Sequence, residues 1–316
     1  MRFFVTGATG FIGGRLVRQL RRSGHGVVAI ARNPAKAKDL ASLGVDVRKG
    51  DVTEKETMRE PMEDVDGVFH LAGWYKIGRK HREACRRVNI DGTRNVLWLM
   101  EQLGIRRGVY TSTLAVFGDT RGKMMDETMR PTGPWLSEYD RTKWAAHYEV
   151  AEPMMKRGLP LVVVMPGLVY GPGDPSQAGD TVRSYLQGKL RGIPRTSAYC
   201  WGHVEDIAAA HVLAMERGRV GESYVVAGEP RTLVAVLELA EKITGIRAPK
   251  FRPSARFLRA LAAITRSEFL RVAPSTYLGN NAKAKREIGL VHRPFEEGWR
   301  ETLRAEMATL GVRGGS

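Results

Sequence analysis

The feature that most constrains this chain is a run of glycines between an apolar strand and an amphipathic helix. Phe3–Thr6 is typical of a strand, and residues 13–22 are typical of a helix with Leu16 and Leu20 on its apolar face. Residues 6–14 between them read Thr-Gly-Ala-Thr-Gly-Phe-Ile-Gly-Gly. Glycines at this spacing allow a tight turn, close approach of an anion to the backbone, and close helix–strand packing. The context predicts a phosphate-binding turn at a helix N-terminus, although a glycine triad alone would indicate only a structural turn.

Strands and helices alternate through the first half of the chain. Further strands are predicted at 27–31, 45–47, 65–71, 108–113 and 161–165, and helices at 34–43, 84–103 and 137–157. This alternation predicts an α/β fold with a doubly wound parallel sheet, the Rossmann arrangement.

The pattern changes after Tyr170. It begins with a Gly- and Pro-rich loop and continues up to Trp201 as a stretch expected to be irregular. We then predict helices at 203–217, 233–244 and 253–265 and a late strand at 223–226. We therefore expect a smaller C-terminal substrate-binding lobe. The predicted division gives 1–171 with 203–228 to the dinucleotide-binding domain, 172–202 with 229–310 to the lobe, and 311–316 to a flexible tail.

Composition narrows the functional classes. With 316 residues, 43% of them hydrophobic, the chain can bury a sizeable core. Two cysteines, Cys85 and Cys200, and a first strand without a preceding leader favour a reducing, cytoplasmic setting. The net charge of +16 suits an anionic cofactor, an anionic membrane surface or nucleic acid. Because no nucleic-acid-binding motif accompanies the charge, we expect no nucleic-acid partner.

The ends of the second and third strands carry the next indications. Enzymes that use NAD commonly place an acid near the end of the second strand, but this chain has Ala31 followed by Arg32. Arg32, with Lys36 as a second candidate, can grip a 2′-phosphate, which favours NADP over NAD, unless Arg32 is simply a surface residue. Asp51, followed by Val52, can accept from an adenine amino group or merely cap a turn.

Tyr139 and Lys143 begin a predicted helix and lie one turn apart on the same face. A nearby ammonium is expected to lower the pKa of the phenol and so allow proton transfer near neutral pH. The pair alone is a weak motif, because many helices contain it. Ser112 and Thr113 end the strand just before this region, where a hydroxyl can bind a substrate oxygen.

At this point the chain resembles the extended short-chain dehydrogenases/reductases, from Phe3 to about Leu303. The matching segments are Thr6–Gly13, His70–Gly73, Asn89 with Gly92-Thr93, Thr111–Gly118, Tyr139–Lys143, Pro166–Pro172 and His203–Asp206. The resemblance implies that Thr113, with Ser112 as the competing choice, positions the substrate oxygen. It also implies that Tyr139 is the acid–base residue, that Lys143 binds the ribose, and that Asn89 supports the site.

The same resemblance extends the cofactor site to loops after two later strands. Ala72 and Gly73 match a loop over the adenosine ribose, and Pro166, Gly167 and Val169 match the stretch beside the nicotinamide. No metal is expected. The full set of expected cofactor-binding residues is Gly7, Thr9, Gly10, Phe11, Ile12, Gly13, Arg32, Lys36, Asp51, Val52, Leu71, Ala72, Gly73, Tyr139, Lys143, Pro166, Gly167 and Val169.

Within the family the chain looks most similar to dihydroflavonol-reductase-like members. This similarity implies an NADPH-dependent reductase of a bulky, largely apolar ketone or aldehyde, acting as a homodimer. Aromatic residues are candidates for the substrate pocket, with ordinary core packing as the alternative: Trp74, Tyr75, Phe117, Trp135, Tyr170, Tyr199 and Trp201.

Two other activities and one further partner stay open. A nucleotide-sugar epimerase or dehydratase with tightly bound NAD(P) would use Arg183, Arg191 or Arg195 for a diphosphate. A non-catalytic relative would bind NADPH without turning over a carbonyl compound. Residues 253–272 form a basic amphipathic segment that either contacts a membrane surface, or closes a substrate pocket or packs on the core.

Overall fold

The computed structural model describes residues 1–313, apart from the side chains of Lys36 and Arg79. Of the predicted tail at 311–316, residues 314–316 therefore lie outside the described residues. The main sheet is parallel throughout, in the order β3-β2-β1-β4-β5-β6-β9. Its strands are β1 (Arg2–Thr6), β2 (Gly26–Ala31), β3 (Asp46–Lys49), β4 (Gly67–His70), β5 (Gly108–Thr111), β6 (Leu161–Pro166) and β9 (Ser223–Val226).

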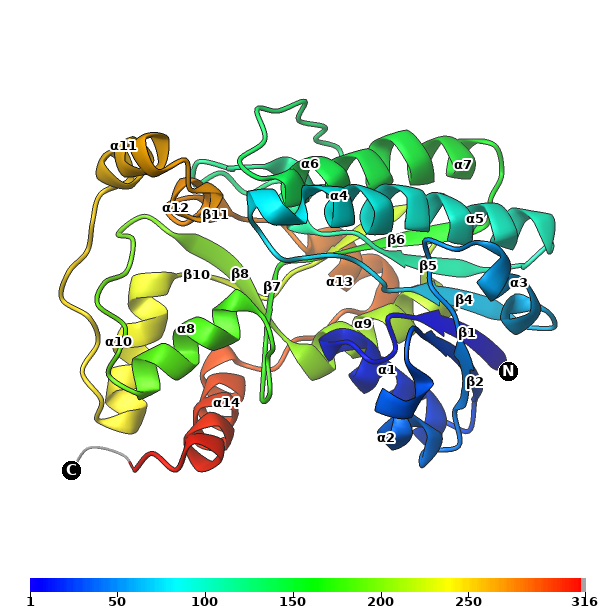
Figure 1. Cartoon of the computed structure of the whole chain (residues 1–316), viewed down its shortest axis with the longest axis horizontal. Coiled ribbons are helices and arrows are strands. Elements are labelled where there is room, and N and C mark those ends of the chain that lie inside the picture. Colours follow the sequence, from blue (N-terminus) through cyan, green and yellow to red (C-terminus); the bar gives the residue numbers. More distant parts are fainter. Residues whose placement is uncertain (314–316) are drawn as a thin grey trace.

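Helices cover both faces of this sheet, as the alternating pattern predicts (Figure 1). One face carries α1 (Phe11–Arg22), α9 (Val204–Arg217) and α13 (Ala282–Ile288), and the other carries α4 (Arg82–Cys85), α5 (Thr93–Gln102), α6 (Glu138–Ala145) and α7 (Glu152–Lys156). Shorter elements are η1 (Pro34–Lys36), α2 (Lys38–Ala41), α3 (Glu56–Met62), η2 (Arg79–His81) and η4 (Leu114–Phe117). The Rossmann prediction is confirmed.

Two predicted helices are interrupted by wider π-helical turns. The turn η3 (Arg86–Gly92) separates α4 from α5, and η5 (Ala146–Ala151) separates α6 from α7. Hydrophobic periodicity continues through such turns, so the sequence pattern predicts single helices. Both turns lie beside functional candidates, Asn89 within η3 and Lys143 just before η5, as π-turns frequently do.

The C-terminal part contains a second sheet around β8 (Ala198–His203). Its other strands are β7 (Leu168–Tyr170), β10 (Glu229–Thr232) and β11 (Thr276–Tyr277), and its helices are α8 (Gln177–Leu186), α10 (Leu233–Thr244), α11 (Ala255–Thr265), α12 (Glu268–Val272) and α14 (Phe295–Leu310). The expectation of irregular chain up to Trp201 is wrong. Residues in that stretch form α8, whose N-cap Ser176 accepts from the Ala178 amide at 3.1 Å, and β8, which pairs with β7, β10 and β11.

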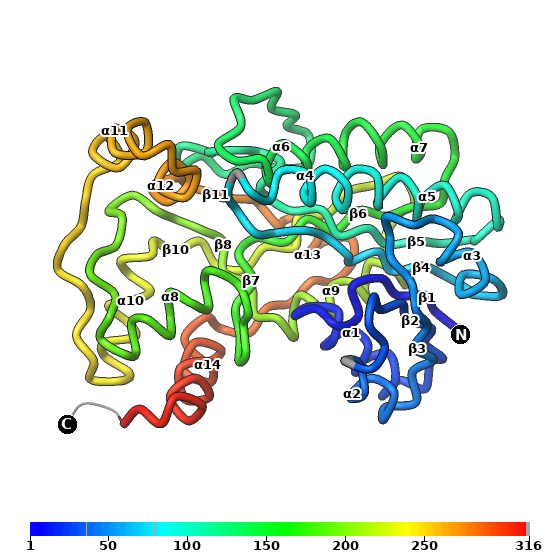
Figure 2. Tube along the Cα trace, viewed as in Figure 1, coloured from blue at the N-terminus to red at the C-terminus, as the bar shows by residue number. Residues whose placement is uncertain are grey.

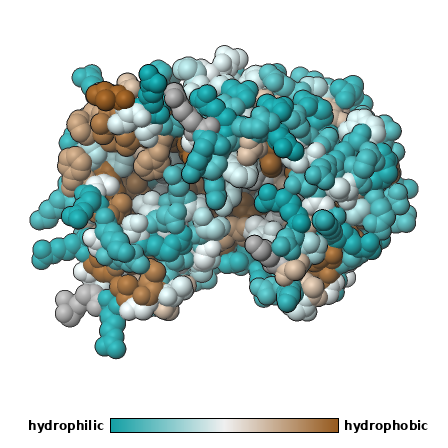
Figure 3. Space-filling model, viewed as in Figure 1, coloured by the Kyte–Doolittle hydropathy of each residue, from teal (hydrophilic) through white to brown (hydrophobic). Residues whose placement is uncertain are grey.

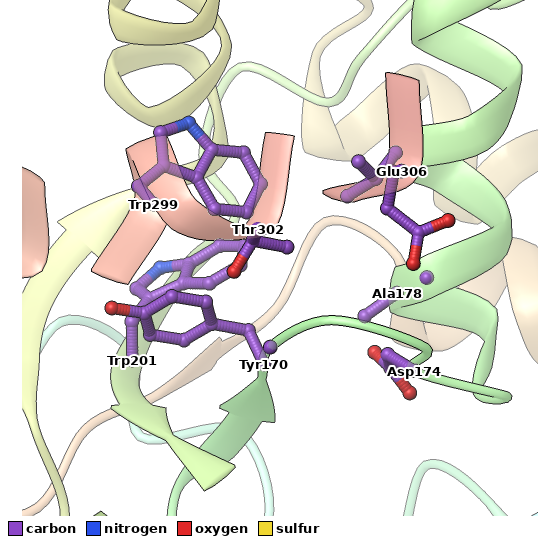
Figure 4. A pocket seen from close by; sticks show the side chains of 10 residues that line it. Tyr170, Asp174, Ala178, Trp201, Trp299, Thr302 and Glu306 are labelled. Carbon is purple, nitrogen blue, oxygen red and sulfur yellow. The ribbon is translucent and has the colours of Figure 1, made fainter. Parts of the chain in front are cut away.

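Three of the aromatic pocket candidates belong to the core instead. Phe117, Tyr170 and Trp201 are buried, with 3%, 3% and 4% of their surface exposed. Tyr170 and Trp201 pack against Phe295 and Trp299 at ring distances of 5.2 to 5.9 Å. Figure 4 shows Tyr170, Trp201 and Trp299 beside a cavity of only about 10 Å³, which has room for about one water molecule. These three rings therefore stabilise the lobe rather than receive a substrate.

The chain passes between the two sheets several times (Figure 2). It leaves the main sheet after β6 into β7, returns from β8 through α9 to β9, and leaves again into β10. Residues 279–290 return once more, and α13 packs its Ala284 and Ile288 into the core under the main sheet. Within residues 1–313, no helix has the length and apolar character needed to cross a membrane.

Candidate active site

The glycine turn joins β1 to α1 in a form that other residues would disrupt. Gly7 has φ +72°, and a Cβ on it would lie 2.7 Å from the Ala72 amide nitrogen. A Cβ on Gly13 would lie 2.1 Å from the Gly7 carbonyl oxygen. Because α1 begins with Phe-Ile-Gly-Gly, its first turn has no acidic side chain to compete with an anion. The turn fits a dinucleotide diphosphate at the α1 N-terminus, with Thr9, Gly10, Phe11 and Ile12 at this end of the helix.

The loop after β4 is fixed against this turn. The Leu71 amide donates to the Thr6 carbonyl oxygen at 3.3 Å, and the Ala72 amide donates to the Thr6 hydroxyl at 3.1 Å. Ala72 thus contacts both the end of β1 and the glycine turn, and Gly73 follows it on an exposed stretch. The structure therefore brings the predicted 71–73 loop to the same sheet edge as the glycine turn.

The second- and third-strand candidates differ in what they contact. Arg32 directly follows β2 and is exposed, at the same carboxyl edge of the sheet. Asp51 Oδ1 accepts from the amide and the hydroxyl of Thr53, both at 2.9 Å, so this carboxylate closes a turn, which was the alternative interpretation. Val52 is buried with its side chain against Gly92. The side chain of Lys36 lies outside the described part of the structure.

The stretch after β6 links the two sheets at the site. Pro166 ends β6, and a Cβ on Gly167 would lie 2.3 Å from the Cys200 carbonyl oxygen of β8. Val169 lies in β7 and pairs with Gly202. The main sheet and the second sheet therefore meet closely at Gly167, and Figure 3 shows the visible face hollowed between the two parts.

Tyr139 and Thr113 lie together at the carboxyl end of β5. Ser137 caps α6, with its hydroxyl accepting from the Asp140 amide at 3.2 Å, and this places Tyr139 in the first turn. Burial raises the pKa of Tyr139 to about 12, and hydrogen bonding with Thr113 opposes that rise. Ser112 points elsewhere: its Oγ is 2.8 Å from His147 Nδ1 in a buried contact. The geometry thus favours Thr113 over Ser112 as the hydroxyl beside Tyr139.

Lys143 is buried, and its ammonium does not bond to Tyr139. Its Nζ donates to the Thr111 carbonyl oxygen at 2.7 Å and to the Tyr110 hydroxyl at 3.1 Å. Burial lowers the pKa of Lys143 to about 7. The pKa of Tyr139 is therefore raised rather than lowered as expected, because desolvation of the phenol has the largest effect on it.

Behind Lys143 lies a buried network that sequence reasoning missed. The rings of His70 and Tyr110 stack at 5.3 Å, and His70 is hydrogen-bonded to Thr6 at 2.8 Å and to Thr93 at 3.0 Å. Burial, together with the charge of Lys143, lowers the pKa of His70 to about 3, so this ring is neutral. The signal was present, because His70 begins the matched segment 70–73 and Tyr110 directly precedes another, but the contact between them required the sheet register.

Asn89 ties η3 to α6 and to the loop after β4. Its Oδ1 accepts from the Trp74 amide at 2.7 Å, and its Nδ2 donates to the Trp74 carbonyl oxygen and to the Thr142 hydroxyl, both at 3.0 Å. Thr142 lies between Tyr139 and Lys143 on α6. Asn89 therefore fixes the helix that carries both candidate residues relative to the loop after β4.

Asp140 is a second residue that the sequence did not single out. It is 2% exposed and accepts from the Tyr277 hydroxyl at 3.2 Å, and the ring of Tyr277 stacks on Tyr199 at 6.1 Å. Burial raises the pKa of Asp140 to about 7, although hydrogen bonds from Ser137 and Tyr277 oppose the rise. A carboxyl group thus lies directly behind Tyr139, in contact with aromatic residues of the second sheet.

The raised pKa of Asp140 predicts a pH-dependent stability. Because the folded chain holds this proton more tightly than the unfolded chain, the contribution of Asp140 to the free energy of unfolding should fall as pH rises from about 4 to about 7. Asp140→Asn removes this titration. The free energy of unfolding of the variant, relative to that of the unsubstituted chain, should therefore rise by about 2 to 4 kcal/mol from pH 4 to pH 8. Urea unfolding at both pH values measures the difference, with Asp39→Asn as an exposed control; a pH-independent difference for Asp140→Asn would contradict the assignment.

Comparison with known proteins identifies the family. The model of the NAD dependent epimerase/dehydratase family matches residues 3–227. A candidate dihydroflavonol 4-reductase from Synechocystis is 34% identical, covering 78% of this chain and 74% of its own length, and sterol demethylase protein B from Methylococcus capsulatus is 31% identical, covering 92% and 94%. The crystal structure of gox2253 superposes with a TM-score of 0.86 at 26% identity, covering 98% of this chain and 99% of that one.

These matches agree with the arrangement of the glycine turn, Thr113, Tyr139 and Lys143 at one edge of the sheet. The match to the family model spans all four, and the structural match extends through the second sheet. The chain therefore belongs to the NAD-dependent epimerase/dehydratase family, within the extended short-chain dehydrogenases/reductases.

Proposed function

We propose that this chain is an NADPH-dependent reductase of ketones or aldehydes with a bulky, largely apolar skeleton. The proposal is carried by the juxtaposition of Tyr139 and Thr113 at the carboxyl edge of the sheet onto which the glycine turn opens. Ligands of open α/β sheets bind at this edge. A bound nicotinamide cofactor would supply the hydride.

The protein's own residues would orient the carbonyl group and supply the proton. The Thr113 hydroxyl would bind the carbonyl oxygen while Tyr139 Oη donates its proton to that oxygen, which converts the carbonyl to an alcohol as the carbon receives hydride. The raised pKa of Tyr139 keeps Oη protonated at neutral pH, as a donor must be. Lys143 would hold the ribose, and its protonated form would stabilise the phenolate until Tyr139 recovers a proton from water.

The choice of NADPH is supported by charge at the end of β2. Ala31 ends the strand where an NAD-binding acid commonly lies, and the exposed Arg32 follows it. A guanidinium can bind a 2′-phosphate through two charge-assisted hydrogen bonds, whereas a ribose hydroxyl offers it no charge. The large positive net charge favours the additional phosphate as well.

The apolar substrate class is supported by a pair of aromatic residues that lies behind Tyr139. Tyr199 is partly exposed, stacks on Tyr277, and through Tyr277 reaches Asp140 beside Tyr139. Two relatives at 31–34% identity have names that refer to a dihydroflavonol and a sterol. A nucleotide-sugar substrate has less support, because Arg183 is already engaged by Asp180 at 2.8 Å and Glu306 at 3.3 Å.

Steady-state assays with both cofactors test the function and the role of Arg32 together. We expect steady NADPH oxidation with a steroid or aromatic ketone, and a kcat/KM for NADPH well above that for NADH. Arg32→Ala should lower kcat/KM for NADPH by about 10- to 100-fold, because a charge-assisted pair to a phosphate is worth about 1.5 to 3 kcal/mol, and should change the NADH value little.

The matched control is Arg106→Ala, an exposed arginine just before β5 at the opposite edge of the sheet. It should leave both cofactors unaffected. Equal losses for NADPH and NADH in Arg32→Ala would remove the 2′-phosphate assignment. Isomerisation of UDP-glucose without net cofactor oxidation would replace the reductase with the epimerase.

A further inference from the structure

The corner of the molecule formed by α11 and its flanking turns exposes an unusual number of large apolar side chains. Phe251, Phe257, Ile264 and Phe269 are 60%, 54%, 81% and 50% exposed. We call these four residues the α11 patch. Figure 3 shows hydrophobic residues gathered at the corner that α11 occupies in Figure 1. Grouped aromatic and aliphatic side chains of this kind mark a surface that meets something other than water.

The helix itself is apolar over a wider arc than the protein covers. Leu258 and Ala262, four residues apart, are buried against the protein. Phe257 and Ile264, seven residues apart, lie on the helix surface next to this buried pair and are exposed to solvent. Leu261 lies between them and is partly exposed. Packing on the lobe therefore explains one edge of the apolar face and leaves the other edge without a protein partner among the described residues.

The segment that carries the patch has more positive than negative charge. Residues 251–272 contain five arginines and one acid, Glu268, which is buried and paired with Arg82 at 3.3 Å. Arg252 and Arg259 pair with Glu238 at 2.8 Å and Asp119 at 2.7 Å. The remaining arginines include Arg256 and Arg266, both exposed within the α11 segment.

We propose that the α11 patch docks on an anionic lipid bilayer, with its apolar side chains among the acyl chains and its arginines at the headgroups. A helix with an exposed apolar line and flanking arginines fits that interface from both sides. A second copy of the chain fits poorly, because a symmetric contact would place the same arginines opposite one another. An anionic bilayer would bury the apolar side chains and would also attract the arginines.

The patch also lies close to the candidate active site. The Arg82–Glu268 ion pair joins α12 to α4, and Tyr277, a few residues after α12, bonds to Asp140 beside Tyr139. Docking would therefore hold the lobe side of the site next to the membrane. If the proposed function holds, an apolar carbonyl substrate dissolved in the bilayer would reach the site from there; the docking itself does not depend on that function.

Sedimentation with lipid vesicles tests the docking. The full chain should bind phosphatidylcholine vesicles that contain 30 mol% phosphatidylglycerol. It should bind vesicles of pure phosphatidylcholine much more weakly. Binding to both kinds of vesicle should decrease as the salt concentration is raised. Phe257→Ser/Ile264→Ser should weaken binding by about tenfold or more. Val220→Ser/Val291→Ser, which changes two valines that are 48% and 77% exposed elsewhere, should leave it unchanged. Thermal unfolding followed by circular dichroism confirms that both double variants are folded.

Two further variants keep the test decisive. Arg256→Glu should weaken binding by roughly fivefold for each unit of charge changed. Phe257→Trp should show a blue shift of tryptophan emission when anionic vesicles are added. Binding that is absent, equal for both lipid mixtures, or unaffected by Phe257→Ser/Ile264→Ser would overturn the proposal. So would a change from dimer to monomer in Phe257→Ser/Ile264→Ser, because the patch would then be a subunit interface.

Discussion

Replacing Tyr139 by phenylalanine should lower kcat for carbonyl reduction by about 10² to 10⁴-fold, because a positioned proton donor contributes that much to the rate. The substitution removes one hydroxyl and keeps the ring that packs in the first turn of α6. Binding of NADPH, measured by the fluorescence change of the cofactor, should stay within about threefold. The free energy of unfolding should fall by about 1 kcal/mol or less, the usual worth of one hydrogen bond.

Tyr148→Phe is the matched control for this variant. Tyr148 lies on the continuation of the same helical segment, and its hydroxyl makes one long hydrogen bond, to the Met129 carbonyl oxygen at 3.4 Å. Its loss should leave kcat unchanged. If Tyr139→Phe retained the full rate while binding NADPH normally, Tyr139 would not be the proton donor and the proposed chemistry would be wrong.

Replacing Gly13 by alanine should prevent saturation with NADPH and lower the free energy of unfolding by about 2 to 4 kcal/mol. The new Cβ would lie 2.1 Å from the Gly7 carbonyl oxygen. One of these atoms belongs to the backbone and the other is bonded directly to it, so no side-chain rotation can separate them. Relief requires α1 to move away from the glycine turn. That movement would displace the N-terminal amides that we expect to bind the diphosphate.

Gly14 provides a control one residue away on the same helix. A Cβ there would meet only the Arg18 guanidinium at 3.4 Å and the Ala8 carbonyl oxygen at 3.6 Å, an ordinary contact and a movable side chain. Gly14→Ala should bind NADPH normally and gain up to about 1 kcal/mol of stability from helix propensity. Titration with NADPH and thermal unfolding compare Gly13→Ala with Gly14→Ala. Equal cofactor binding and equal stability of the two variants would show that the glycine turn tolerates a side chain.

Local patterns predicted the main sheet well because most of its strands are buried on both faces and bounded by glycine-containing turns. The end of β1, the glycine turn and the start of α1 follow from neighbouring residues alone. The second sheet could not be found in this way. β8 is held by three strands that come from distant parts of the chain, so its existence depends on pairing rather than on its own sequence.

The candidate site shows the same limit. The motifs placed Thr113, Tyr139 and Lys143 at one sheet edge, but the state of these groups depends on burial. Lys143 bonds to Tyr110 and Thr111, and the pKa of Tyr139 is raised, because the surrounding side chains exclude water. Asp140 and Tyr277 meet across 137 residues of chain, a contact that no local spacing indicates.

The repeated passage of the chain between its two sheets also limits how such a protein can diversify. The main sheet is completed by β9, which follows β7 and β8 in the sequence, so a fragment that ends after β6 would leave that strand with an open edge. No single recombination crossover can exchange the second sheet while leaving the main sheet whole. New specificities on this framework should therefore arise by substitutions and loop insertions within one gene, rather than by exchange of modules between genes.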